Sequence, residues 1–315
     1  MIRHLAIPAC IALVACTPLD KGRKPAAAPI LIDDTALRTQ FEAKMAKLVE
    51  GGGATPQTTL NEQLSRSSCK LKLPATGRTP MSPAEIYQNR LNSVVMVAKL
   101  YHCSSAECKK VHANIASGVV IHEDGIVLTN YHVAAGKQNK GLGMGVMTGD
   151  GKAFLVKEVL AADKAGDVAI LRLKGASGLD AAPVLRDEPV GNPVTIISHP
   201  AGNFYTLSHG RIARYCKEDD GSSRMYVTAD YAKGSSGGPI FNECGDVVGL
   251  VSSTISTPYR QLPLTIDPKT KSLGVAGKET EPAQLNGMPL VMDLNHQMTI
   301  KSAVAASEVT KLIEK

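Results

Sequence analysis

Short apolar runs separated by turn residues fill the chain between residues 93 and 255. Gly, Asn and Asp punctuate these runs, and no long stretch there has the period of an amphipathic helix. Strands at such short intervals are typical of antiparallel β-barrels and sandwiches, whereas an α/β protein alternates its strands with helices. The pattern therefore predicts an all-β core.

A helical pattern precedes this core in the sequence. Asp33 or Asp34 can cap a helix that runs to Glu50, where a run of three glycines ends it. The apolar face of this helix is narrow, and its positions at helical spacing are Leu37, Phe41, Lys44 and Leu48. We expect the helix to pack on the core, and a regulatory or oligomerising arm is the alternative.

A second helix start precedes the first core strand. Ser82 supplies a cap, Pro83 stands at the first helical position, and Glu85 completes a capping box. The strand Val94–Val97 follows directly. Residues 54–80 are rich in Thr, Ser and Pro and are expected to be mostly loop.

Three segments carry candidate chemistry. Ser236 lies in the run Gly-Ser-Ser-Gly-Gly-Pro at 234–239, where glycines allow a tight turn with several amides aimed at one point. His132 follows an apolar strand, an Asp-Gly turn and a second apolar strand, and Asp167 immediately precedes a β-rich run. A serine hydroxyl is a poor nucleophile unless a base activates it and donors stabilise the oxyanion. This set of residue types therefore points to acyl transfer.

These three segments, in the order His, Asp, Ser, resemble the chymotrypsin-like serine proteases, and most of all their bacterial HtrA-type branch. The resemblance runs from about Ser82 to the C-terminus. It implies two six-stranded antiparallel barrels, with His132 and Asp167 on one and Ser236 on the other, and a closing helix over 303–313. It also implies that Ser236 is the nucleophile, that His132 is the general base and that Asp167 orients the imidazole. The amides of Gly234 and Ser236 would form the oxyanion hole.

Neighbouring residues compete for two of these roles. Asp163 stands four places before the aspartate of this set, and Ser235 immediately before its serine. The run Gly-Asp-Val-Ala-Ile-Leu favours the later aspartate, and Ser236 alone directly precedes Gly-Gly-Pro. His122 and His199 lie in turn-like surroundings and are interpreted as structural or solvated histidines.

Two positions depart from the trypsin pattern. Trypsin-type zymogens place an aspartate before the nucleophile, where it pairs with a newly cut amino terminus. Ser235 stands there and carries no charge, so activation by cleavage is not expected. Asp230, six residues before Ser236, occupies the place of a buried carboxylate that selects Lys or Arg, although Lys233 is close enough to neutralise it. Asp230, together with Ser252, is a candidate specificity residue.

Two other functions compete with an endopeptidase. The serine run also matches the Gly-x-Ser-x-Gly elbow of α/β-hydrolase esterases, with Asp267 and His296 in the required chain order. The β-like pattern opposes this fold. The other alternative is a catalytically silent or occluded protease-fold module that binds peptides. Residues 255–290 form a longer stretch than the family core needs, and this stretch could be a lid, a specificity loop or decoration.

The first residues look like an export signal. Arg3 precedes an apolar stretch, Leu5 to Val14, that is too short to cross a membrane. Leu-Val-Ala-Cys at 13–16 resembles the lipobox of a bacterial lipoprotein, which implies cleavage before Cys16 and its acylation; an ordinary secretion signal is the alternative. The implied location is the bacterial cell envelope, on the periplasmic face of the outer membrane. The expected segments are a lipoprotein signal peptide (1–15), a tether (16–32), a helix-and-loop extension (33–80) and the protease domain (81–315).

An oxidising compartment allows disulfides. Besides Cys16, the expected mature chain keeps Cys69, Cys103, Cys108, Cys216 and Cys244. We expect one bridge between Cys103 and Cys108 and another between Cys216 and Cys244, which leaves Cys69 over.

The net charge of +6 becomes +5 without Arg3, and no basic block is present. Nucleic-acid binding is therefore not indicated, and the expected partners are protein or peptide substrates and, through the lipid, a membrane. No cofactor is expected, since the Cys and His spacing gives no zinc site. HtrA-type enzymes usually carry a PDZ domain after the protease domain. None is expected here, so PDZ-driven activation is not carried over.

Overall fold

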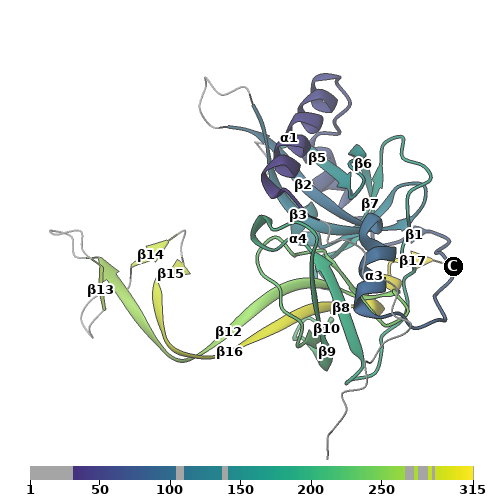
Figure 1. Cartoon of the computed structure of the whole chain (residues 1–315). Coiled ribbons are helices and arrows are strands. Elements are labelled where there is room, and N and C mark those ends of the chain that lie inside the picture. Colours follow the sequence, from purple (N-terminus) through teal and green to yellow (C-terminus); the bar gives the residue numbers. More distant parts are fainter. Residues whose placement is uncertain are drawn as a thin grey trace, which may run out of the picture. The chain divides into compact units, whose positions relative to one another are not determined.

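The structure of this chain is a computed structural model, which describes residues 31–103, 110–136, 141–266, 273–275, 283–285 and 288–314 (Figure 1). No helix within these ranges is long and apolar enough to cross a membrane. The elements described below all belong to one unit, Asp33–Lys315. The expected signal peptide, Cys16 and residues 17–30 of the expected tether lie outside the described residues.

Six antiparallel strands close the first barrel. They are β2 (Val94–His102), β3 (Val111–His122), β4 (Ile126–Thr129), β5 (Gly141–Thr148), β6 (Ala153–Asp163) and β7 (Val168–Leu173). Their order is β2-β3-β4-β7-β6-β5, and β5 pairs back with β2. Val97, Val127 and Leu171 are fully buried members of the core cluster inside it. These are the apolar runs that the sequence places between turns.

A second barrel follows in the chain. Its strands are β8 (Pro193–Ser198), β9 (Thr206–Lys217), β10 (Ser223–Val227), β11 (Pro239–Phe241), β12 (Val247–Ile266) and β16 (Val291–Ala305). The order β11-β8-β9-β10-β16-β12 closes because β11 also pairs with β12. The predicted all-β fold of two six-stranded antiparallel barrels is confirmed. It excludes the α/β-hydrolase architecture; Asp267 and the His296 side chain lie outside the described residues.

The N-terminal helix α1 (Asp34–Glu50) begins and ends where the sequence predicts. Asp33 caps it by accepting the N–H of Ala36 at 2.9 Å. Phe41 and Met45 are fully buried, and α1 contacts strands β3, β5 and β6. The helix is therefore packed on the first barrel. The buried face differs from the predicted one after Phe41, because Met45 rather than Lys44 fills the contact with β5.

The capping box of the second predicted helix is also present. In α3 (Pro83–Arg90) the Ser82 side chain accepts the Glu85 N–H, and the Glu85 carboxylate accepts the Ser82 N–H. A short turn of 3-10 helix, η1 (Leu91–Ser93), leads directly into β2.

The segment 54–80 is not all loop. It contains α2 (Gln57–Gln63), which the sequence pattern did not predict, and the two-residue strand β1 (Cys69–Lys70). Two amides of α2 hold the chain that follows His132: Gln57 donates to Ala134 O at 3.0 Å, and Asn61 to Gly136 O at 2.9 Å. These contacts join residues far apart in the sequence, so local periodicity does not reveal this helix.

The C-terminal part holds a long β-ladder and a short helix. β12 and β16 pair from Gly249 with Ala305 to Pro263 with Val291, and Figure 1 shows them side by side. Shorter elements complete it: β13 (Leu273–Val275) on β12, β14 (Gln284–Leu285) with β15 (Met288–Pro289), α5 (Ala306–Thr310), and β17 (Ile313–Glu314) parallel to β1.

The predicted closing helix over 303–313 was too long. Ala303 and Ala305 are buried in the second barrel, where β16 pairs with β10 and β12, and α5 has five residues. Alanine favours helices, but pairing on both sides of the strand overrides this weak preference.

The predicted bridge between Cys216 and Cys244 was wrong. Both are free thiols in the structure. Cys216 is on β9, whereas Cys244 lies in the turn after β11, and β8 separates these two strands. The predicted bridge from Cys103 involves Cys108, which lies outside the described residues.

Candidate active site

His132 and Asp167 form a close pair on the first barrel. His132 is in the single turn α4 (Tyr131–Ala134) after β4, and Asp167 lies between β6 and β7. The His132 Nδ1 is 3.0 Å from each carboxylate oxygen, and the His132 N–H donates to Oδ1 at 3.1 Å. An ionised carboxylate can only accept hydrogen bonds, so Nδ1 carries the hydrogen in this pair. In the neutral ring, Nε2 is then free to take a proton.

The Asp167 carboxylate is held in place from several sides. Its backbone has φ of +58°, a left-handed conformation that Asp tolerates better than most residues. Asn130 donates to its carbonyl at 3.0 Å, and the Ser252 hydroxyl donates to Oδ2 at 2.7 Å. Burial on its own raises the pKa of this carboxyl. Donors from His132 and Ser252 outweigh burial and leave the pKa below its usual range.

Ser236 comes to this pair from the second barrel. Its hydroxyl donates to the Ser252 carbonyl at 3.2 Å rather than to His132. Ser236 lines one cleft together with His132, so the structure brings the predicted serine and histidine together. Strand β3 supports this loop across the two barrels, because the Ser117 N–H donates to Ser236 O and the Ser117 hydroxyl to Gly234 O, both at 2.9 Å.

Ser235 occupies a different environment from Ser236. It is fully buried, and its hydroxyl accepts from that of Ser198 at 3.0 Å. Asp163, the competing aspartate, instead accepts the N–H of Ala165 within its own turn. Neither competitor reaches the His132 imidazole in these contacts.

The backbone around Ser236 can form a donor pocket. Gly234 has φ of +100°, and a side chain there would collide with the His199 carbonyl. The Lys233 carbonyl is held by the Ala201 N–H at 2.6 Å, in the short turn η2 (Pro200–Gly202). No hydrogen bond between described residues uses the N–H of Gly234 or Ser236. Both amides are therefore available to a substrate oxygen.

Asp230 does not have the buried position that its predicted specificity role requires. Its side chain is 92% exposed, and Lys301 rather than Lys233 lies 3.4 Å from it. A carboxylate this exposed is screened by water and selects charge weakly. The Ser252 hydroxyl contacts Asp167, and the predicted role of Ser252 in specificity stays a prediction.

Two histidines outside the candidate pair differ in their exposure to solvent. His199 is 1% exposed, whereas the His122 ring is partly exposed beside Asp124, at 3.6 Å. Two positioning residues were not predicted from the sequence: Ser117, which holds the nucleophile loop, and Asn130, which holds Asp167. The signal for Ser117 was a polar residue inside an apolar strand, because a buried hydroxyl there needs a partner.

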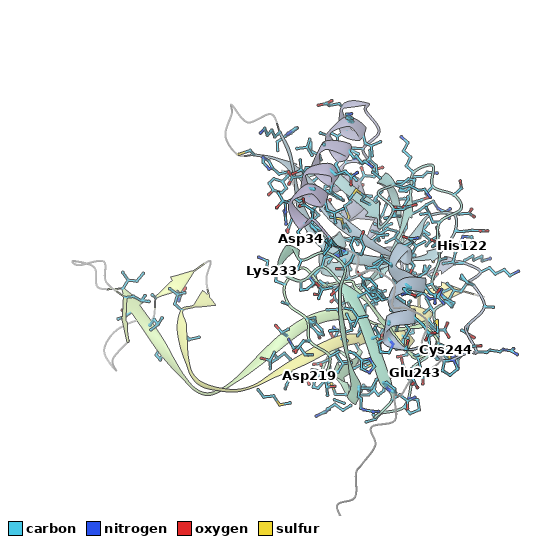
Figure 2. All side chains as sticks on the ribbon, in the orientation of Figure 1. Asp34, His122, Asp219, Lys233, Glu243 and Cys244 are labelled. Atoms are coloured by element: carbon cyan, nitrogen blue, oxygen red, sulfur yellow. The ribbon has the colours of Figure 1, made fainter. Side chains whose placement is uncertain are left out.

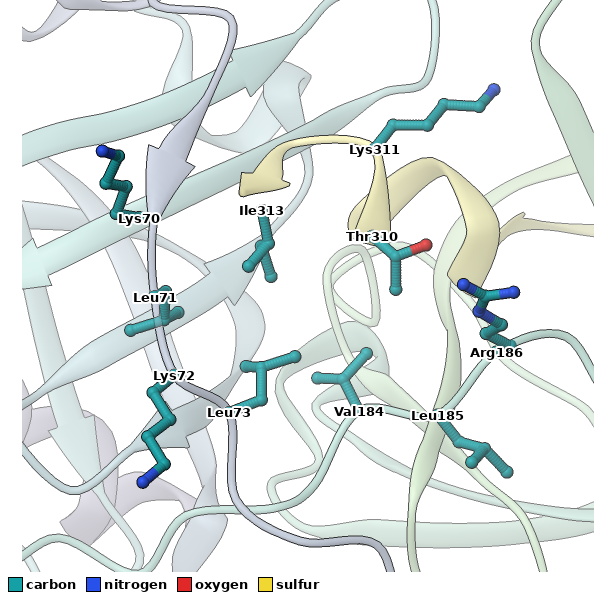
Figure 3. A pocket seen from close by; sticks show the side chains of 10 residues that line it. All are labelled: Lys70, Leu71, Lys72, Leu73, Val184, Leu185, Arg186, Thr310, Lys311 and Ile313. Atoms are coloured by element: carbon teal, nitrogen blue, oxygen red, sulfur yellow. The ribbon is translucent and has the colours of Figure 1, made fainter. Parts of the chain in front are cut away.

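The candidate site opens into a cleft, and a larger cavity lies elsewhere on the molecule. The cleft beside Ser236 has a volume of about 430 Å³. A larger cavity, of about 1040 Å³, lies among β1, β17 and α5 and contains none of the predicted site residues. Figure 3 shows Leu73, Val184 and Ile313 directed into this larger cavity. Within the described ranges, no three His, Cys, Asp or Glu side chains form a group that could hold a metal ion.

Known proteins share sequence similarity with part of this chain. Residues 116–250 match the family of trypsin-like peptidase domains. The chain is 33% identical over 153 residues to the magnetosome formation protease MamE of Paramagnetospirillum magneticum, covering 46% of this chain and 20% of that protein. It is 30% identical over 158 residues to a probable periplasmic serine protease do/HhoA-like of Haemophilus influenzae, covering 48% and 33%.

The fold has a solved neighbour. The HtrA-type protease AlgW with a decapeptide superposes with a TM-score of 0.51 at 18% identity, covering 73% of this chain and 67% of that one. This likeness supports the fold. The aligned segments span a fifth to a third of the length of the two curated relatives.

Proposed function

We propose that this chain is a serine endopeptidase that hydrolyses protein substrates through an acyl-enzyme. The observation that carries the proposal is the His132–Asp167 pair, with Nδ1 fixed on a carboxylate and Ser236 in the same cleft. The match of residues 116–250 to trypsin-like peptidase domains supports it.

In the first half of the proposed reaction, Ser236 Oγ attacks the carbonyl carbon of the scissile bond while His132 Nε2 takes its proton. The imidazolium that forms is stabilised by Asp167, which stays ionised. The amides of Gly234 and Ser236 donate to the tetrahedral oxyanion. Loss of one such donor typically costs about 2.7–4 kcal/mol of transition-state stabilisation.

In the second half, His132 returns its proton to the leaving amine, and the amine departs. Water then attacks the Ser236 ester, with His132 as base again, and releases the carboxylic acid. Ser252 positions Asp167 through its hydroxyl, and Ser117 holds the loop of the nucleophile. Every proton in this proposed cycle passes through His132, so each step requires the imidazole to be held by Asp167.

We further propose that the enzyme works in a bacterial cell envelope, with a lipid on Cys16 that anchors it at the periplasmic face of the outer membrane. The lipobox-like run at 13–16 supports this location, and two curated relatives are named as periplasmic. Activation by zymogen cleavage is not part of the proposal, because Ser235 is a buried neutral residue.

Hydrolysis of casein and of a fluorogenic peptide library tests the activity. The wild type should cleave both, and Ser236→Ala should lose at least about 10³-fold in kcat/KM. Ser235→Ala is the matched control, since it removes the neighbouring hydroxyl and should stay within about tenfold of the wild type. Equal losses in both variants would contradict the assignment of Ser236.

One observation favours a second candidate, the silent peptide-binding module. The Ser236 hydroxyl bonds the Ser252 carbonyl rather than His132. If this contact persists with substrate bound, the serine is not activated. Peptide binding without hydrolysis by the folded wild type would support this candidate. We favour the enzyme because catalytic hydrogen bonds often tighten only in the substrate complex.

A further inference from the structure

The cleft beside Ser236 carries an unbalanced charge. Three of its lining residues are basic (Arg38, Lys99 and Lys233), and none is acidic. The remaining lining residues are small, apolar or neutral, apart from His132. An occupant of this cleft therefore meets positive charge without a compensating carboxylate on its walls.

The extension helix α1 supplies one of these cations and is firmly attached. The Asp34 carboxylate, one turn before Arg38, accepts the Phe204 N–H at 2.8 Å. On the other side of the cation, Phe41 is fully buried against the first barrel. The Arg38 guanidinium lies 3.3 Å from the place where a Gly202 side chain would begin. Arg38 is thus held over η2 by contacts on both sides.

The three basic side chains differ in whether the protein already supplies them with hydrogen-bond or salt-bridge partners. Lys99 donates to the carbonyls of Ala135, at 2.7 Å, and His132, at 3.3 Å, so the backbone already uses this ammonium group. Arg38 and Lys233 are exposed, and neither makes a salt bridge with another described residue. Figure 2 shows Lys233 on the same side of the molecule as Asp34, at the start of α1. Two unpaired cations therefore flank the cleft.

The position of the cleft beside His132 and Ser236 indicates which part of a substrate would occupy it. In the proposed reaction the carbonyl oxygen sits at the Gly234 and Ser236 amides, and the leaving nitrogen must lie near His132. The cleft continues from these residues along Val133 and the β3 segment 113–116. The chain that follows the leaving nitrogen is therefore the part of the substrate that enters it.

We propose that Arg38 and Lys233 make the cleft a binding site for acidic side chains that follow the scissile bond. This inference rests on the proposed function for its cleavage test, and it identifies the substrate class as protein segments with Asp or Glu there. Each exposed ion pair should raise kcat/KM for an acidic peptide only a few-fold. The two cations together should therefore give about a tenfold preference for the acidic peptide.

Matched peptides test the preference. Each pair has the same sequence up to the scissile bond and differs by Glu or Lys in the first three positions after it. We expect the wild type to cleave the Glu peptide with about tenfold higher kcat/KM. Arg38→Glu should abolish or reverse this ratio, measured within the variant. Lys47→Glu makes the same charge change on an exposed residue of α1 outside the cleft and should keep the ratio.

A binding assay separates failure of the inference from failure of the proposed function. Fluorescence anisotropy of the same labelled peptides is measured on Ser236→Ala, with and without Arg38→Glu. Weaker binding of the Glu peptide on adding Arg38→Glu supports the inference, even if the wild type cleaves nothing. Cleavage without a charge preference would overturn the inference and leave the protease standing. Equal effects of Arg38→Glu and Lys47→Glu would also overturn it, since only net charge would then matter.

Discussion

Protonation of His199 should destabilise this protein in mild acid. The imidazole is buried behind the candidate site, and Phe204 and Tyr205 pack edge-on against it. Its Nδ1 accepts the Tyr205 N–H at 3.1 Å, so the folded protein holds the ring neutral. Burial lowers the pKa of His199 to about 4, because the charged form would lose its water.

The size of the effect follows from the two pKa values. In the unfolded chain an imidazole titrates near 6.5, so below that pH the unfolded state binds a proton that the folded state refuses. The contribution of neutral His199 to the free energy of unfolding is therefore fully present above about pH 6.5. It is lost as the pH drops toward 4. With these values, the loss is about 1 kcal/mol at pH 6, about 2 at pH 5 and about 3 at pH 4.

Urea unfolding of the full chain between pH 7 and pH 4 measures this loss. His199→Asn keeps an acceptor for the Tyr205 N–H but does not titrate in this range. The stability difference between wild type and His199→Asn should shrink by about 2 kcal/mol from pH 7 to pH 5. His102→Asn, at an exposed histidine, is the matched control. A difference for His199→Asn that stays constant from pH 7 to pH 5 would refute the reasoning.

Three further predictions concern the site and its support. Ser252→Ala removes a hydrogen bond to a buried carboxylate, about 1.5 kcal/mol, and should lower kcat/KM on a fluorogenic peptide about tenfold; an unchanged value would mean that Asp167 is held without it. A histidine base takes a proton only in its neutral form, so kcat/KM should fall when acid protonates the imidazole; a kcat/KM that is the same at pH 5 and pH 8 would exclude His132 as the base. Phe41→Ala empties a fully buried site and should cost about 3 kcal/mol or more in urea unfolding; a loss below about 1 kcal/mol would show that α1 unfolds separately.

Local signals in the sequence predicted much of the fold. The cap at Asp33 and the box at Ser82 involve residues three apart, and the barrel strands alternate with turns over short distances. Such signals are complete within one segment, so they can be recognised before the chain is folded. The same is true of the runs that carry His132, Asp167 and Ser236.

The parts that the sequence did not predict depend on contacts between distant segments. Gln57 begins a helix whose partners lie 77 residues away at Ala134. The barrel pairs Ala303 with strands on either side, which turns a helical pattern into a strand. Asp230 meets Lys301 at the surface, and only the folded barrel shows that its carboxylate is exposed. No spacing rule contains this information.

The nucleophile is the central claim, and covalent labelling tests it most directly. The full chain is treated with a fluorophosphonate probe, and the modified peptide is identified by mass. The account predicts a single adduct on Ser236, absent in Ser236→Ala and much slower to form in His132→Ala. An adduct on Ser235, or none at all on the folded wild type, would contradict it.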